Sequence, residues 1–234
     1  MLDHLSDTSR RAAVIHSMSE EPKSLGIPAV RNARLAALQL PHIAPLSAFV
    51  HSLRGQMGPG HHIPYVDPAD GGIHADCLFL LEAPGPQAVQ SSFVSRDNPD
   101  ESAKNFFLLN REAGIIRERT IVWNIVPWYV GSGTKIRPVH ARDILAAAPA
   151  LKDLLFLLPF LHSIVLVGRK ANLARNTLSI LAPKTALHPV PHPSPLYVNR
   201  SPTNRHTLLA ALLQVAGNLP LNAVKCEPSR RDHA

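Results

Sequence analysis

Apolar and polar residues follow one another along this chain in blocks that predict strands and helices in turn. Four short apolar runs, ended by Pro, Gly or polar residues, are typical of buried parallel strands. They are Cys77–Leu81, Thr120–Val126, Ser163–Val167 and Thr185–Val190. Helical spacing of apolar residues is found over Ser102–Ala113, Asp143–Leu158 (with a break or kink at Pro149), 169–181 and Thr203–Ala216. This alternation predicts an α/β fold, a three-layer α/β/α sandwich with a central, mostly parallel four-stranded sheet.

The first third of the chain has a different pattern. Residues 1–27 are polar with little periodicity, which predicts a flexible N-terminal arm. Residues 28–75 predict a helical extension packed on the core, with helices over Ala29–Leu40 and Pro45–Arg54. A loop rich in Gly, Pro, His and Asp follows over residues 55–75. We therefore expect the α/β domain to span residues 76–220, with a C-terminal tail over 221–234.

Composition places the chain among globular proteins with a single core, because 234 residues are 45% hydrophobic and 18% charged. The longest apolar run, Leu154–Leu161, is far shorter than the roughly 20 residues that cross a bilayer. We therefore expect a soluble, cytoplasmic protein. Two cysteines, Cys77 and Cys226, cannot form a disulfide framework or a four-cysteine metal site, and the 13 histidines are scattered. No metal is expected, and Cys77 is predicted to be a buried packing residue.

Charge is distributed unevenly along the chain. Residues 1–153 contain 15 Lys or Arg and 15 Asp or Glu, whereas residues 154–226 contain seven Lys or Arg and no acid. The net charge of +7 therefore arises from this second stretch. A region of one sign indicates a polyanionic partner, most simply nucleic acid, although ordinary surface charge gives the same count.

Three short motifs follow the ends of predicted strands, where ligands bind in parallel sheets. Glu82-Ala83-Pro84-Gly85 forms a sharp turn in which Gly85 leaves room for a planar ligand. Asn124 brings an amide that both donates and accepts to an apolar strand, and it could read the O4 and N3–H edge of uracil. His192, in a proline-rigid loop, could stabilise an anionic leaving group. The structural alternatives are a Pro-Gly turn, an Asn bonded to loop backbone and an incidental surface His.

Neighbouring residues extend this set. Phe93 is either a stacking face for a base or a core side chain, and Asp97 is either a water-positioning acid or a turn residue. The residues predicted to contact DNA, as phosphate ligands or as an apolar wedge, lie beyond His192. They are Ser194, Pro195, Leu196, Arg200 and Arg205.

Taken in order, these segments resemble the uracil-DNA glycosylase superfamily over about Asp76 to Ala216. Glu82–Gly85 resembles its first motif in a Glu-Ala-Pro-Gly form, and His192–Leu196 matches its second motif, including the intercalating Leu. Asn124 and Phe93 fall where the family has its uracil-reading Asn and its stacking Phe. The resemblance implies excision of uracil, or a related deaminated base, from single- or double-stranded DNA by base flipping. We also expect a monomer that needs no cofactor.

The departures from the family pattern affect the mechanism. Ala83 replaces the water-activating Asp of the best-known branch, so Asp97, with Glu82 behind it, is the predicted acid. Gly85 replaces the Tyr that excludes thymine there. The branch with Glu-Ala-Pro-Gly usually carries a four-cysteine iron–sulfur cluster, which two cysteines cannot hold. Two alternatives stay open: a DNA-binding protein of this fold without efficient catalysis, and a different α/β enzyme acting on nucleotides or nucleosides.

Overall fold

A four-stranded, fully parallel sheet forms the centre of the computed structural model, which describes residues 21–132 and 135–220. Its strand order is β4-β2-β7-β8, with the crossovers that parallel pairing requires. The strands are β2 (Cys77–Leu81), β4 (Thr120–Asn124), β7 (Ser163–Val167) and β8 (Ala186–Val190). β2, β4 and β7 are almost wholly buried, as their continuous apolar sequences require. The predicted α/β sandwich is therefore confirmed.

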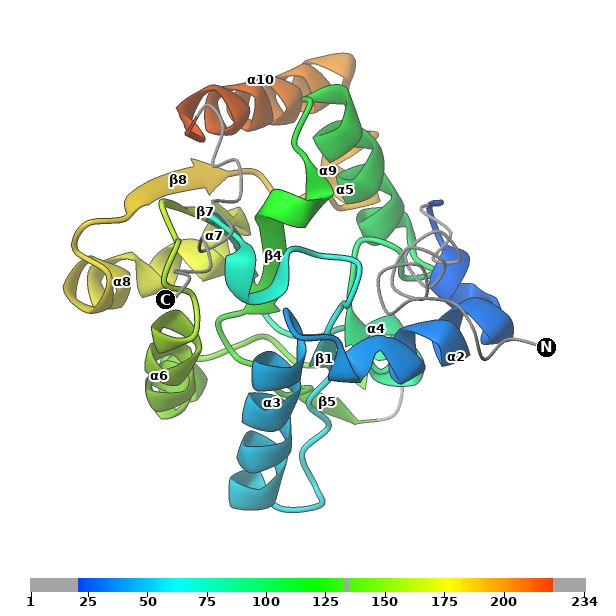
Figure 1. Cartoon of the computed structure of the whole chain (residues 1–234). Helices are drawn as coiled ribbons and strands as arrows, with labels where there is room; N and C mark the ends of the chain where they lie inside the picture. Colours follow the sequence, from blue (N-terminus) through cyan, green and yellow to red (C-terminus); the bar gives the residue numbers. More distant parts are fainter. Residues whose placement is uncertain (1–20, 133–134, 221–234) are drawn as a thin grey trace, which may run out of the picture.

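Helices cover both faces of this sheet (Figure 1). On one face, Phe79 of β2 meets Phe106 edge-on at 4.9 Å between ring centroids. On the other face, Trp123 of β4 packs against Phe49 at 5.9 Å. The helices that carry these contacts and pack beside them are α5 (Glu101–Glu112) with α10 (Pro202–Asn218), and α3 (Ala44–Met57) with α6 (Ala141–Phe156). Alternate residues of the central strands thus enter two different hydrophobic layers.

Two prolines lie inside regular elements. Pro189 lies in β8, an edge strand, where a missing N–H removes no ladder bond that the sheet needs. Pro149 lies inside α6, which continues from Ala141 to Phe156, so the helix does not end at this proline as a break would require.

The N-terminal third is more closely joined to the core than its sequence predicts. Leu25 is fully buried, and its N–H donates to the carbonyl of Asp97 at 3.1 Å. Ser24 and Leu25 are therefore packed on the core, which corrects the expected flexible arm over residues 1–27 at these positions. Residues 1–20 lie outside the described chain. The expected loop over residues 55–75 contains β1 (Tyr65–Val66), which pairs in parallel with β3 (Phe93–Val94).

Short elements complete the described chain. They are η1 (Ser24–Gly26), α2 (Pro28–Ala36), η2 (Ala37–Gln39), η3 (Gly72–His74), α4 (Pro86–Ser91), η4 (Arg117–Arg119), β5 (Gly131–Ser132), β6 (Lys135–Ile136), α7 (Gly168–Ala171), η5 (Asn172–Ala174), α8 (Arg175–Leu181) and α9 (Pro195–Val198). Cys77 is buried and free, as predicted, and Cys226 lies outside the described residues. Within the described ranges, no helix is long and apolar enough to span a membrane.

Candidate active site

All four strands of the sheet contribute to one cleft at their carboxyl ends. Leu81 and Asn124 end β2 and β4, Gly168 follows β7, and His192 follows β8 by two residues. The cleft has a volume of about 780 Å³. Because the carboxyl ends of parallel strands meet at one edge, segments more than a hundred residues apart converge there.

Asn124 brings a buried hydrogen-bond donor to this cleft. The residue is only 2% exposed, and β4 fixes its position through the pairing of Asn124 with Leu81. Its Nδ2 atom is buried and has no hydrogen-bond partner among the described residues. A buried amide normally finds a partner, because leaving it unsatisfied costs about 1–3 kcal/mol. The arrangement is therefore suited to a ligand that supplies an acceptor.

His192 faces the same cleft with a defined tautomer. Its Nδ1 accepts a hydrogen bond from the backbone N–H of Ser194 at 3.1 Å, which leaves the proton on Nε2. Burial lowers the pKa of His192, against the opposing effect of the Glu82 and Asp100 carboxylates. The imidazole is therefore neutral at pH 7 and offers Nε2–H as a donor.

Two neighbours, Gly168 and Asn105, define the position of His192 and its loop. Gly168 has a φ of +86°, and a Cβ built there would lie 3.1 Å from the Cβ of His192, so a side chain would be strained and crowded. The amide of Asn105, on α5, donates to the carbonyl of Pro193 at 3.1 Å. The loop that carries His192 is thus fixed against both β7 and α5.

The turn after β2 lines the cleft with Glu82, Ala83, Pro84 and Gly85. Gly85 has an ordinary φ of −83°, and a Cβ built there would meet no atom within 4 Å. The missing side chain therefore leaves open space in the cleft rather than relieving the backbone. Glu82 accepts a hydrogen bond through Oε1 from the N–H of Val139 at 3.2 Å. Glu82 thereby supports the part of the cleft wall formed by residues 136–138.

This geometry can be set beside known proteins. The sequence profile of the Uracil DNA glycosylase superfamily matches residues 61–215, more than half of the chain. The chain belongs to the uracil DNA glycosylase superfamily. A search of curated proteins finds no match. Among solved structures, a solution structure of a candidate uracil DNA glycosylase from Methanosarcina acetivorans is similar, with 16% identity and a TM-score of 0.44. That alignment covers 61% of this chain and 92% of the other.

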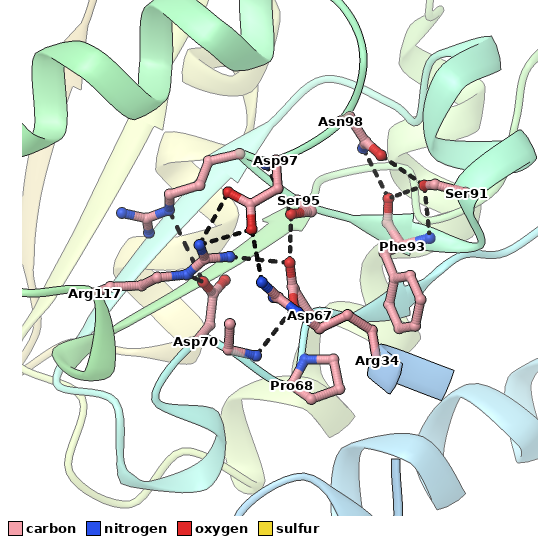
Figure 2. A network of polar contacts seen from close by, with 12 residues as sticks. Arg34, Asp67, Pro68, Asp70, Ser91, Phe93, Ser95, Asp97, Asn98 and Arg117 are labelled. Atoms are coloured by element: carbon pink, nitrogen blue, oxygen red, sulfur yellow. Dashed lines mark hydrogen bonds and ion pairs between the residues drawn. The ribbon is translucent and has the colours of Figure 1, made fainter. Parts of the chain in front are cut away.

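The cleft does not include Phe93, so the expectation that its ring stacks on a base is corrected. Its side chain is fully buried and packs against Tyr65 at 6.3 Å between ring centroids. Ser91 and Asn98 hold its backbone, with the Asn98 amide donating to the Phe93 carbonyl at 2.9 Å (Figure 2). Pairing with β1 turns the ring toward the N-terminal extension. Phe106 is the aromatic residue that lines the cleft within the described ranges.

Asp97 is also outside the cleft, in a buried group that we term the ion-pair cluster. Its members are Arg34, Asp67, Asp70, Arg96, Asp97 and Arg117. Asp97 receives hydrogen bonds from Arg34 at 2.9 Å and from Arg117 at 2.8 and 2.9 Å (Figure 2). Because both carboxylate oxygens bind arginines, Asp97 cannot position a water in the cleft, which corrects its predicted role.

The ion-pair cluster joins the extension to the core. Asp67 pairs with Arg34 and with Arg117, the latter at 2.9 Å, and Asp70 accepts from Arg117 at 2.9 Å. Although burial raises the pKa of Asp67, Arg34 and Arg117 lower it to about 2. Burial raises the pKa of Asp70 to about 6, against the opposing effect of Arg96 and Arg117.

The residues expected to contact DNA are placed unequally. Ser194 precedes the short helix α9 at its N-cap position without a side-chain capping bond, and Leu196 on α9 is 88% exposed. Arg200 is exposed, and its side chain forms no hydrogen bond or ion pair with any described residue. Arg205 instead pairs with Glu112 of α5, with one hydrogen bond at 3.2 Å, so the expectation of a free phosphate ligand is corrected.

Several cleft residues escaped the sequence analysis. They are Asp100, Ser102, Phe106, Ile136, Arg137, Pro138, Arg169 and Lys170. The only signal for Asp100 was the order Asn-Pro-Asp before a helical pattern, which is typical of an N-cap. Within residues 21–132 and 135–220, no group of three or more His, Cys, Asp or Glu could hold a metal ion.

Proposed function

We propose that this protein is a DNA glycosylase that hydrolyses the N-glycosidic bond of uracil, or of a related deaminated base, after flipping the base into the cleft. One observation carries the proposal: the buried Asn124 amide and the neutral His192 imidazole line the same cleft, each with a donor for a ligand. Membership of the superfamily supports the same reaction class.

Asn124 supplies base selection in this proposal. Its Nδ2–H donates to O4 of uracil, while cytosine carries an amino donor at that position and leaves the amide unpaired. A site built to bond one polar group rejects an analogue that lacks it, because the buried group is then unsatisfied. Uracil is therefore bound in preference to cytosine.

His192 supplies leaving-group stabilisation. As the bond between C1′ and N1 breaks, negative charge develops on the uracil ring and its O2 accepts from Nε2–H. A preorganised donor of this kind contributes about 10²–10³-fold in rate. Asn105 and Gly168 keep the imidazole in position, so no reorganisation is needed during the reaction.

Leu196 acts on the DNA duplex and Gly85 on the choice of base in this proposal. An exposed Leu on a rigid turn fits the apolar wedge that fills the gap left by a flipped base. The open space at Gly85 lets the cleft accept a 5-methyl group, so thymine opposite guanine is a candidate substrate.

Base release from oligonucleotides tests the proposal. The substrates carry one U·G, U·A, T·G or hypoxanthine·T pair, or a single-stranded U, and wild type is compared with Asn124→Ala and His192→Ala. We expect uracil release that each substitution lowers by about 10²-fold or more. No release from any substrate, with salt-sensitive DNA binding intact, would instead support a DNA-binding protein of this fold. Release that does not depend on salt or strand length would support an enzyme of free nucleotides.

A further inference from the structure

The cleft contains two acidic residues among those described, Glu82 and Asp100. Resting on the proposed function, we infer that Asp100 is the catalytic residue that orients and deprotonates the attacking water. Ala83, in the turn after β2, brings no acid to the cleft, and the ion-pair cluster holds Asp97, so the water needs another carboxylate.

Asp100 has one oxygen engaged and one available. It is the N-cap of α5, and its Oδ1 accepts from the N–H of Ala103 at 2.9 Å. Its Oδ2 forms no hydrogen bond or ion pair with a described residue. The capping bond fixes the position of the carboxylate. Asp100 is thus a preorganised acceptor at the wall of the cleft.

Helix α5 also sets the position of Asp100 relative to His192. Asp100 begins the helix, and Asn105, five residues later, holds the carbonyl of Pro193 at 3.1 Å. Asp100 and His192 both line the cleft, so one ligand can reach both side chains. A single rigid element therefore places the acid that would act on water beside the imidazole that would act on the base.

Glu82 has a different role in the same cleft. Its Oε1 accepts from the N–H of Val139, whose carbonyl accepts from Nζ of Lys170 at 2.9 Å. The peptide of Val139 is thus held on both sides by side chains that follow β2 and β7. Through Oε1, Glu82 thus supports the cleft wall formed by residues 136–138.

The proposed step is balanced as follows. Water donates one proton to Oδ2 of Asp100 while its oxygen forms a bond to C1′ of the deoxyribose. The bond between C1′ and N1 breaks, and its electron pair leaves with the uracil as an anion that His192 stabilises at O2. The proton on Asp100 then passes to the uracil anion or to solvent. The products are a C1′ hydroxyl at the abasic site and neutral uracil.

Asp100→Asn separates catalysis from helix capping. Asn is as good an N-cap as Asp, so the acceptor for Ala103 and the melting temperature should be retained. We expect the single-turnover rate of uracil release to fall by about 10²-fold or more. The Kd for uracil-containing DNA should change by less than about threefold, because this interaction acts in the transition state.

Glu101→Gln is the matched control, because Glu101 follows Asp100 on α5 and is exposed but does not line the cleft. It should retain the wild-type rate of uracil release. Glu82→Gln tests the second carboxylate of the cleft, because Gln keeps an acceptor for the N–H of Val139. A wild-type rate in Asp100→Asn would overturn the inference and leave the proposed function standing. Loss of release in Glu82→Gln alone would assign the step to Glu82. Failure of wild type to release any base would reject the proposed function, and this inference with it.

Discussion

The ion-pair cluster and the cleft lie on two sides of one loop, residues 94–100. Ser95 links the two regions, since it lines the cleft and its hydroxyl donates to Asp67 of the cluster. Asp97 binds two arginines, whereas Asp100, three residues later, keeps one oxygen free. In the cluster, opposite charges of the protein pair with one another, although Oδ2 of Asp70 has no hydrogen-bond partner among the described residues. In the cleft, Asn124 and Asp100 keep atoms without partners among the described residues.

The comparison separates polar groups that stabilise the fold from polar groups that await a ligand. Residue type does not distinguish them, because aspartates occur in both regions. The distinguishing feature is where the group lies: members of the cluster pair with one another, whereas Asn124 and Asp100 line the cleft. This placement depends on contacts between segments far apart in sequence. Variants on the two sides of the loop should therefore fail in different assays.

The largest effect is expected in the ion-pair cluster. Arg117→Met removes one partner of Asp67, Asp70 and Asp97 at once. The three buried carboxylates are left with only Arg34 and Arg96 as cationic partners. Breaking a buried pair in this way costs about 3–5 kcal/mol, so the urea midpoint should fall sharply. Arg205→Met, which breaks an exposed pair, is the control. Equal urea midpoints for Arg117→Met and wild type would contradict the structural role of the cluster.

A smaller combined effect is expected at Gly168. Gly168→Ala adds a Cβ at a positive φ, which costs about 1–2 kcal/mol, and it presses on His192. His192 must then shift by a few tenths of an ångström. Because catalysis depends on accurate positioning, the rate of uracil release should fall several-fold. Gly217→Ala in α10, where an added Cβ meets nothing within 4 Å, should preserve both properties. Unchanged release in Gly168→Ala would show that His192 tolerates the shift.

Asp70 should make stability depend on pH. Burial raises its folded pKa from 3.8 to about 6, so between these values the folded state binds more protons than the unfolded state. Stability contributed by this group is present below pH 4 and is lost as pH rises toward 6. The free energy of unfolding of wild type should therefore fall relative to that of Asp70→Asn between pH 4 and pH 6. A constant difference between the two urea curves would contradict this assignment.

The smallest effect separates two arginines beyond His192. Arg200 has no partner among the described residues, whereas Arg205 pairs with Glu112. Arg200→Met should reduce the slope of log K against log salt by about one unit for DNA binding, and Arg205→Met should change it less. Fluorescence anisotropy over a salt series measures both slopes. The reverse order would place the DNA path along α5 and α10.

The sheet and the convergence of the motifs were predictable, because continuous apolar runs define parallel strands whose ends meet. Glu82, Asn124 and His192 therefore reach one cleft as expected. The roles of Asp97 and Phe93 were not predictable, since they depend on Arg34, Arg117 and Tyr65, whose contacts cross 20 to 63 residues. The local sequence indicated a turn at Asp97 and a helix N-cap at Asp100, and neither signal shows which carboxylate binds arginines. Only the long-range pairing of Asp97 with Arg34 and Arg117 separates the two residues.

Asn124→Ala, measured for stability and base release in the same preparation, tests the central claim most directly. The account predicts unfolding at the wild-type temperature or above, because the substitution removes a buried donor without a partner, together with a loss of about 10²-fold in single-turnover uracil release. A variant that unfolds earlier and releases uracil at the wild-type rate would show that the Asn124 amide serves the fold and not a ligand.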